Sequence, residues 1–127
     1  MVINFLSIFI GGGIGAVLRY IVTIMCRNLF SLSIIGTLSV NLIGCFLIGC
    51  IFGLVLNKSN VLPQILRLFI TVGFLGGLTT FSTFNLEVFE LIKNGKVIIG
   101  LLYMIGSCLI GLMLTFAGYY LTCKSVA

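Results

Sequence analysis

The amino-acid sequence predicts an all-α membrane protein with four transmembrane helices in each subunit. Of its 127 residues, 61% are hydrophobic and only 7% are charged, and the mean hydropathy is +1.37. A soluble domain of this length needs a much larger polar share to cover its surface. Four apolar runs are each long enough to cross the hydrocarbon core, which takes about 20 helical residues.

The four predicted helices cover residues 3–25, 32–56, 66–92 and 97–121 and form a single transmembrane domain. The links CRNLFS, NKSNVLPQ and KNGK contain turn formers, among them Pro63 and the pair Asn94-Gly95. The first run does not resemble a cleavable signal peptide, because it is too long and lacks a basic amino-terminal region. A chain this short cannot enclose an ordinary transport pathway alone, so we expect an oligomer.

The loop charges favour neither orientation in the membrane. Lys and Arg residues are equally frequent on the two sides, with Lys58, Arg67 and Lys124 on one and Arg27, Lys93 and Lys96 on the other. An imbalance between the sides normally sets the orientation. Its absence predicts that the chain inserts both ways and that its copies pair as an antiparallel homodimer. A fixed topology set by a weaker signal is the alternative.

Close helix packing is predicted by the spacing of the glycines. Three G-x-x-x-G pairs occur, at Gly11/Gly15, Gly49/Gly53 and Gly73/Gly77. In lipid, such pairs let helix backbones approach each other and gain van der Waals contact. A dinucleotide-binding loop is excluded because no strand surrounds these glycines.

The segment GGLTTFSTFNLEVFE, residues 76–90, is unusually polar for a membrane interior. Five polar side chains fall within seven positions, at Thr79, Thr80, Ser82, Thr83 and Asn85. Hydroxyls can bond back to their own helix, and Gly76-Gly77 weakens it further. We therefore predict that the third helix is broken near the midplane. Irregular backbone there must be buried in protein or line a watery cavity, where its carbonyls suit a hard cation and its hydroxyls an anion.

Four other residues inside the membrane have two interpretations each. Arg19 lies near the end of the first helix and either reaches the headgroups or serves a site. Asn41, well inside the second helix, either bonds a neighbouring helix or binds a ligand. Phe81 and Phe84 share a helix face and either pack or present their positive ring edges to an anion.

Several classes of function are excluded by what the chain lacks. It contains no His, the commonest general base and metal ligand, and we expect no enzyme. The five cysteines form no C-x-x-C pair, so apolar packing is favoured over a metal or redox site. The net charge of +5 fits contact with anionic lipid rather than nucleic acid. The first carboxylate is Glu87, late in the third helix, which favours a passive anion route over a proton-coupled one.

Three motifs carry a resemblance to a known family: GGGIGAVLRY at residues 11–20, GTLSVNLIG at 36–44 and GFLGGLTTFSTFNLE at 73–87. Together they resemble the Fluc (CrcB-type) fluoride channels of microbial membranes over essentially the whole chain. The resemblance implies an antiparallel, dual-topology homodimer in the cytoplasmic membrane, with two fluoride pores at its interface. It also implies a structural sodium ion at the dimer centre, held by the backbone carbonyls of Gly76 and Thr79.

The resemblance further assigns residues to the pore. Asn41, Phe81 and Phe84 line it, and Arg19 attracts the anion. From the polar segment itself, and not from the resemblance, we also predict that the hydroxyls of Thr80, Ser82 and Thr83 line the pore. A hydroxyl track on the fourth helix matches Tyr103 and Ser107, but the next step is Gly111, which departs from it. The implied role is detoxification, because HF that leaks inward ionises and the trapped fluoride must leave through a channel.

Two other functions compete with a fluoride channel. A small dual-topology, proton-coupled exporter needs an acidic residue in the middle of the first helix, where this chain carries only Arg19. A non-transporting assembly subunit of the membrane accounts for the glycines but leaves the polar cluster at residues 79–85 unused. Fluoride efflux measured against chloride separates the three.

Overall fold

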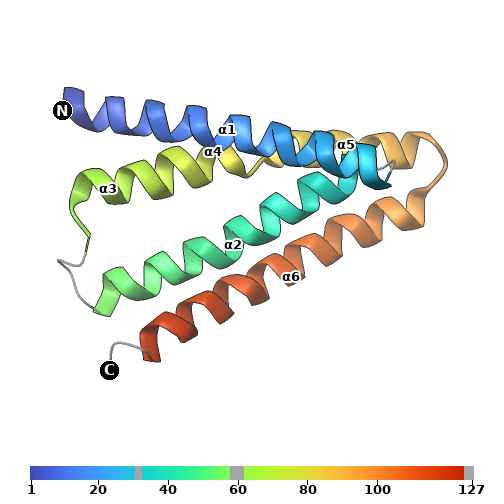
Figure 1. The fold of residues 1–127 in the computed structure, drawn as a ribbon. Helices are drawn as coiled ribbons and strands as arrows, with labels where there is room; N and C mark the ends of the chain where they lie inside the picture. Colours follow the sequence, from blue (N-terminus) through green and yellow to red (C-terminus); the bar gives the residue numbers. More distant parts are fainter. Residues whose placement is uncertain (31–32, 58–61, 125–127) are drawn as a thin grey trace.

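The computed structural model describes residues 1–30, 33–57 and 62–124. Helix α1 (Val2–Phe30) is followed by α2 (Ser33–Asn57), by a segmented third helix and by α6 (Val97–Lys124). All four spans are long and apolar enough to cross a membrane. Helix α2 runs beside α6, and α1 lies along the third helix (Figure 1). The predicted all-α fold with four candidate spans is confirmed.

The third helix consists of four pieces: α3 (Gln64–Leu68), η1 (Phe69–Leu75), α4 (Gly76–Leu78) and α5 (Phe81–Lys93). Segment η1 is a wide π-helical stretch, a form that often accompanies functional sites. Between α4 and α5 the backbone is extended, with φ/ψ of −82°/153° at Thr79 and −148°/121° at Thr80. The predicted break is confirmed, at the middle of the span Gln64–Lys93. The break comes after Gly76 and Gly77, and these two glycines remain helical.

Some predicted helix ends were wrong. Helix α1 continues through most of the expected link CRNLFS and ends at Phe30. Polar residues beyond the apolar run keep their helical hydrogen bonds, and Arg27 in the last turn suits the negative end of the helix dipole. The expected turn at Asn94-Gly95 is confirmed, with a φ of 77° at Gly95. Lys58, counted among the loop charges, lies outside the described residues.

Glycines bring α1 and the third helix into backbone contact. A β-carbon on Gly11 would lie 2.5 Å from the Phe69 carbonyl oxygen, and one on Gly73 would lie 2.8 Å from that of Ile8. Gly15 meets the Phe74 carbonyl just as closely. The predicted glycine packing is confirmed here, and Gly49 and Gly53 make equivalent contacts with α6. The polar break is therefore held at a fixed height against α1.

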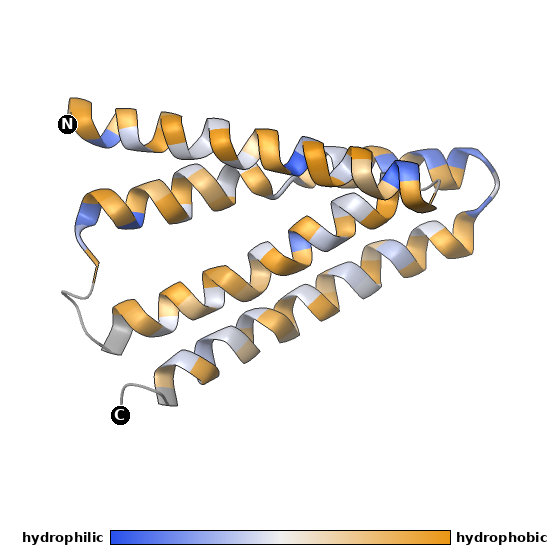
Figure 2. Cartoon of the chain, viewed as in Figure 1, coloured by the Kyte–Doolittle hydropathy of each residue, from blue (hydrophilic) through white to orange (hydrophobic). Residues whose placement is uncertain are grey.

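All four spans are mostly apolar along their length (Figure 2), and many of their large apolar side chains are exposed. The buried core is small and centres on Val40, Leu75 and Leu78, where α2 meets the third helix. Such an exterior suits lipid or a protein partner rather than water. Polar residues concentrate at the helix ends and around the break (Figure 2).

Candidate functional site

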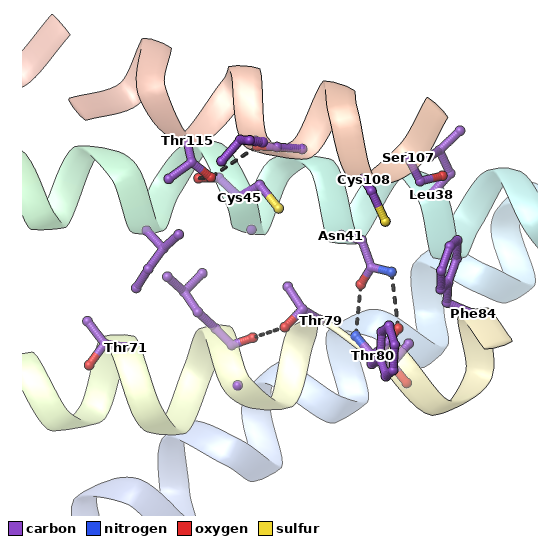
Figure 3. A pocket seen from close by; sticks show the side chains of 17 residues that line it. Leu38, Asn41, Cys45, Thr71, Thr79, Thr80, Phe84, Ser107, Cys108 and Thr115 are labelled. Atoms are coloured by element: carbon purple, nitrogen blue, oxygen red, sulfur yellow. Dashed lines mark hydrogen bonds between the residues drawn. The ribbon is translucent and has the colours of Figure 1, made fainter. Parts of the chain in front are cut away.

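The break in the third helix is fastened to α2 by Asn41. The Thr80 N–H donates to Asn41 Oδ1 at 2.8 Å, and Asn41 Nδ2 donates to the Thr80 carbonyl at 3.1 Å (Figure 3). In a continuous helix the Thr80 N–H would instead donate to the Gly76 carbonyl. The Asn41 amide thus satisfies both backbone polar groups of Thr80 and releases the Gly76 oxygen from its usual donor.

Arg19 fastens the same break from the opposite side. Its Nε donates to the Gly77 carbonyl at 3.1 Å, an oxygen that the Phe81 N–H would reach in a continuous helix. The half-buried guanidinium therefore lies at the break instead of reaching for the headgroups. This contact places a positive charge beside the polar segment.

The start of α5 gathers the predicted hydroxyls. Thr80 caps the helix, because its Oγ1 accepts from the Thr83 N–H at 3.4 Å. The same hydroxyl donates to Thr83 Oγ1 at 3.1 Å and lies 3.5 Å from Ser82 Oγ. The first amides of a helix lack carbonyl partners and carry the positive end of its dipole. This terminus therefore suits an anion.

The oxygens expected to hold sodium fit a hard monovalent cation. Gly76 is exposed and its carbonyl has lost the Thr80 donor, while Thr79 has left the helical conformation. In the described part of the chain, no group of three or more His, Cys, Asp or Glu residues is placed to hold a metal. Neutral carbonyls without a nearby carboxylate suit an alkali ion better than a divalent one.

A hollow of about 510 Å³ lies between α2, the third helix and α6 (Figure 3). Its wall includes Asn41, Thr80 and Ser107, three residues predicted for the site. Gly76 and Thr79 also line it. The hollow therefore joins the break to the second and fourth helices, whereas Ser82 and Thr83, also predicted for the site, do not line it.

Phe81 and Phe84 both border the hollow but differ in solvent exposure. Phe81 is 75% exposed, whereas Phe84 is 5% exposed. Their ring centroids are 6.1 Å apart, and Phe84 also meets Tyr103 at 4.9 Å in an edge-to-face arrangement. The outward ring is free to contact a second molecule, and the inward ring is part of the subunit core.

Glu87 and Thr115 were not predicted for the site. Glu87 is buried and accepts from Thr37 Oγ1 at 2.7 Å and from the Tyr103 hydroxyl at 2.9 Å. Tyr103, expected in a hydroxyl track, therefore donates to this carboxylate and does not border the hollow. Thr115 does line the hollow and donates to the Cys45 carbonyl at 3.0 Å. Two signals could have found them: Glu87 lies one turn after Phe84, and Thr115 continues the four-residue spacing.

Comparison with known proteins identifies the family. Residues 6–119 match the family described as "CrcB-like protein, Camphor Resistance (CrcB)". The chain belongs to the CrcB family. The resemblance expected from the three motifs is therefore confirmed, and it covers the break, the hollow and the residues that fasten them.

Curated relatives in the CrcB family carry a functional name. A protein of Aquifex aeolicus (strain VF5) named "Fluoride-specific ion channel FluC" is 41% identical over 116 residues, which cover 91% of this chain and 93% of that protein. A protein of the same name from Azobacteroides pseudotrichonymphae genomovar. CFP2 is 43% identical over 114 residues, covering 89% and 90%.

Proposed function

We propose that this chain forms a passive, fluoride-selective channel of the cytoplasmic membrane that lets fluoride leave the cell. The observation that carries the proposal is the broken third helix, held open by Asn41 and Arg19 beside a hollow of about 510 Å³. The name of the relatives supports the choice of anion. The benefit to the cell is removal of fluoride that enters as HF and ionises.

A small, strongly hydrated anion needs many donors to replace its water. The hollow offers the second proton of Asn41 Nδ2, since one proton is directed to the Thr80 carbonyl. The amides at the start of α5 that have no carbonyl partner add further donors beside the hollow. The ring edges of Phe81 and Phe84 carry partial positive charge without binding the anion tightly. Arg19 raises the local potential and attracts the anion.

The working unit in this proposal is an antiparallel homodimer with two pores. One subunit supplies one wall of the hollow and leaves Phe81 and Gly76 exposed on the same side of the third helix. A second copy related by two-fold symmetry covers these residues and brings its own hollow, so each dimer contains two routes. The balanced loop charges support insertion in both orientations.

A sodium ion completes the proposed dimer as a structural component. The carbonyls of Gly76 and Thr79 from both subunits would hold it. When bound, the ion supplies positive charge that compensates carbonyl oxygens released from helical hydrogen bonds. The residues of this chain do the rest: Asn41 keeps the Thr80 N–H away from the Gly76 oxygen, and Arg19 occupies the Gly77 oxygen.

A proton-coupled exporter is the second candidate, and Glu87 is the observation in its favour. A buried carboxylate with two hydroxyl donors resembles the acid that such exporters need. The acid lies at one end of the polar cluster, however, and both of its oxygens already accept hydrogen bonds. A passive route fits this arrangement better, and an imposed pH gradient separates the two functions.

The decisive experiment is anion efflux from liposomes. Protein reconstituted into vesicles loaded with potassium fluoride should release fluoride when valinomycin is added, whereas chloride-loaded vesicles should retain their anion. The fluoride rate should not require a pH gradient. Dependence on the gradient would establish an exporter, and equal release of chloride would remove the selectivity. Absence of flux from intact dimers would favour the assembly subunit.

Topology is tested separately from transport. A cysteine-free tag at one terminus, labelled in intact and in permeabilised cells, should report both orientations in comparable amounts. A single orientation in more than about nine-tenths of the copies contradicts the antiparallel dimer, because too few copies of the opposite orientation would then be available to pair.

A further inference from the structure

Two thiols border the hollow that we assign to the anion. Cys45 comes from α2 and Cys108 from α6, and both line the cavity of about 510 Å³. Figure 3 shows both sulfur atoms directed toward its interior. Both cysteines are outside any disulfide in the structure. Neither residue has a part in the proposed conduction of fluoride.

The two thiols flank one gap in the wall, at Gly111. A β-carbon on Gly111 would lie 3.1 Å from Cys45 Sγ, so the missing side chain leaves that sulfur uncovered. Cys108 precedes Gly111 by one helical turn and therefore lies on the same side of α6. Gly111, where the hydroxyl track is interrupted, thus leaves the Cys45 sulfur accessible from the hollow.

Hydroxyl oxygens around the hollow are poor ligands for a soft cation. Thr79 Oγ1 donates to the Leu75 carbonyl at 2.9 Å, and Thr115 Oγ1 donates to the Cys45 carbonyl at 3.0 Å. Both protons are therefore directed into the protein. Hydroxyl and carbonyl oxygens are hard ligands, whereas thiolate sulfur selects soft metal ions. A soft cation in the cavity would therefore prefer sulfur to these oxygens.

We infer that Cys45 and Cys108 together bind one soft, thiophilic cation such as Ag⁺ or Cu⁺. Both S–H bonds break, two protons leave to water and two sulfur–metal bonds form, without electron transfer. The complex carries one net negative charge and occupies the route of an anion. Soft metals should therefore inhibit transport by this chain, an expectation that rests on the proposed function.

The first test is inhibition of fluoride efflux by silver. Vesicles are prepared in nitrate, because chloride precipitates Ag⁺. Silver should stop efflux in the wild type, and Cys45→Ser or Cys108→Ser should raise the half-inhibiting concentration at least about tenfold, the scale on which metal sites respond to loss of a supporting group. Gly111→Ala should act in the same direction by covering Cys45 Sγ.

Cys50→Ser is the matched control. Cys50 lies on the same helix as Cys45 and is equally half-buried, but its sulfur packs beside Gly118 and does not line the hollow. Its replacement should leave silver inhibition unchanged. Inhibition that persists in the double variant Cys45→Ser/Cys108→Ser overturns the inference, as does efflux that silver does not affect.

The second test does not depend on transport. Detergent-solubilised protein is given one Ag⁺ per chain, alkylated with a maleimide and digested, and the label on each cysteine is measured by mass spectrometry. Cys45 and Cys108 should be protected together, whereas Cys26 should remain labelled. Equal protection of all three refutes a two-thiol site. If untreated protein releases no fluoride, the proposed function fails while this measurement still decides the site.

Discussion

The two glycines that precede the break have different surroundings on neighbouring faces of the third helix. A β-carbon on Gly77 would meet the Gly12 carbonyl and lie 3.1 Å from the Ala16 nitrogen, whereas the nearest atom to one on Gly76 is the Thr71 oxygen at 3.9 Å. One face is closed by the backbone of α1, and the other borders the hollow. The closed face holds the irregular backbone in place. The open face leaves its oxygens and donors free for a ligand or a second subunit.

The largest effect is expected from a substitution on the face that α1 closes. Gly77→Val inserts carbons against the α1 backbone, which cannot move aside, so we expect a loss above the usual overpacking cost of about 1–3 kcal/mol and poor yield of folded protein. Gly76→Val meets open space within the subunit. It should fold but be unable to form the proposed dimer or to gain stability from sodium.

Thermal unfolding and gel filtration, each in sodium and in N-methylglucamine, measure both variants. Wild-type protein should be more stable in sodium, and Gly76→Val should be equally stable in the two cations. Equal wild-type stability in both would refute a bound sodium ion. If Gly76→Val misfolds like Gly77→Val, the two faces are not distinct.

Asn41→Asp should nearly abolish fluoride efflux while the dimer still forms. The change keeps the side chain's size but removes the donor to the Thr80 carbonyl and adds negative charge to the route. An unsatisfied carbonyl costs about 1–3 kcal/mol when fully buried, and the cost here should be at the lower end because the Thr80 carbonyl is partly buried. Ser39→Ala on the same helix is the control, since Ser39 bonds only the Ile35 carbonyl of its own helix. Unchanged efflux from Asn41→Asp would give Asn41 a structural role alone.

Thr37→Val should lower the free energy of unfolding by about 1.5–3 kcal/mol, the range for a hydrogen bond to a charged group. It removes the 2.7 Å bond to Glu87 and keeps the shape of a fully buried side chain. Thr23→Val is the matched control, because the Thr23 hydroxyl only bonds back to Arg19 within α1. Chemical denaturation compares the two variants. Equal free energies of unfolding would mean that the hydrogen bonds of Glu87 do not stabilise the fold.

The smallest effects are expected from substitutions of the two phenylalanines, one buried and one exposed. Phe84→Ile alters a buried ring and should cost stability, whereas Phe81→Ile alters an exposed ring and should leave the isolated subunit unchanged. Both should slow fluoride efflux if ring edges line the route, by an amount consistent with about 0.5–1.5 kcal/mol per aromatic interaction. Normal efflux from both variants would assign the rings to packing.

The fold was largely predictable from local sequence. Apolar run length gave four spans, glycine spacing gave the contact of Gly11 and Gly15 with the third helix, and clustered hydroxyls gave the break. Helix ends such as Phe30 were missed because an apolar run shows only which part of a helix lies in the hydrocarbon core. The helix itself continues beyond the core until a turn interrupts its backbone hydrogen bonds.

The partners within the site were not predictable in the same way. Asn41 and Thr80 are far apart in sequence. Nothing in the sequence around either residue indicates that the Asn41 amide bonds the N–H and the carbonyl of Thr80. Arg19 had two physically sound alternatives, and only the height at which α1 meets Gly77 decides between them. Tyr103 had the expected spacing, but spacing does not reveal that Glu87 accepts its hydroxyl proton.

The amide clamp between Asn41 and Thr80 has a consequence for the kinetics of assembly. Because it closes within one chain, the broken helix exists before any partner arrives. In the proposed antiparallel dimer, two subunits would therefore meet as preorganised halves, and neither would have to unwind a helix in lipid during association. A newly inserted subunit of either orientation would then be equally ready to pair.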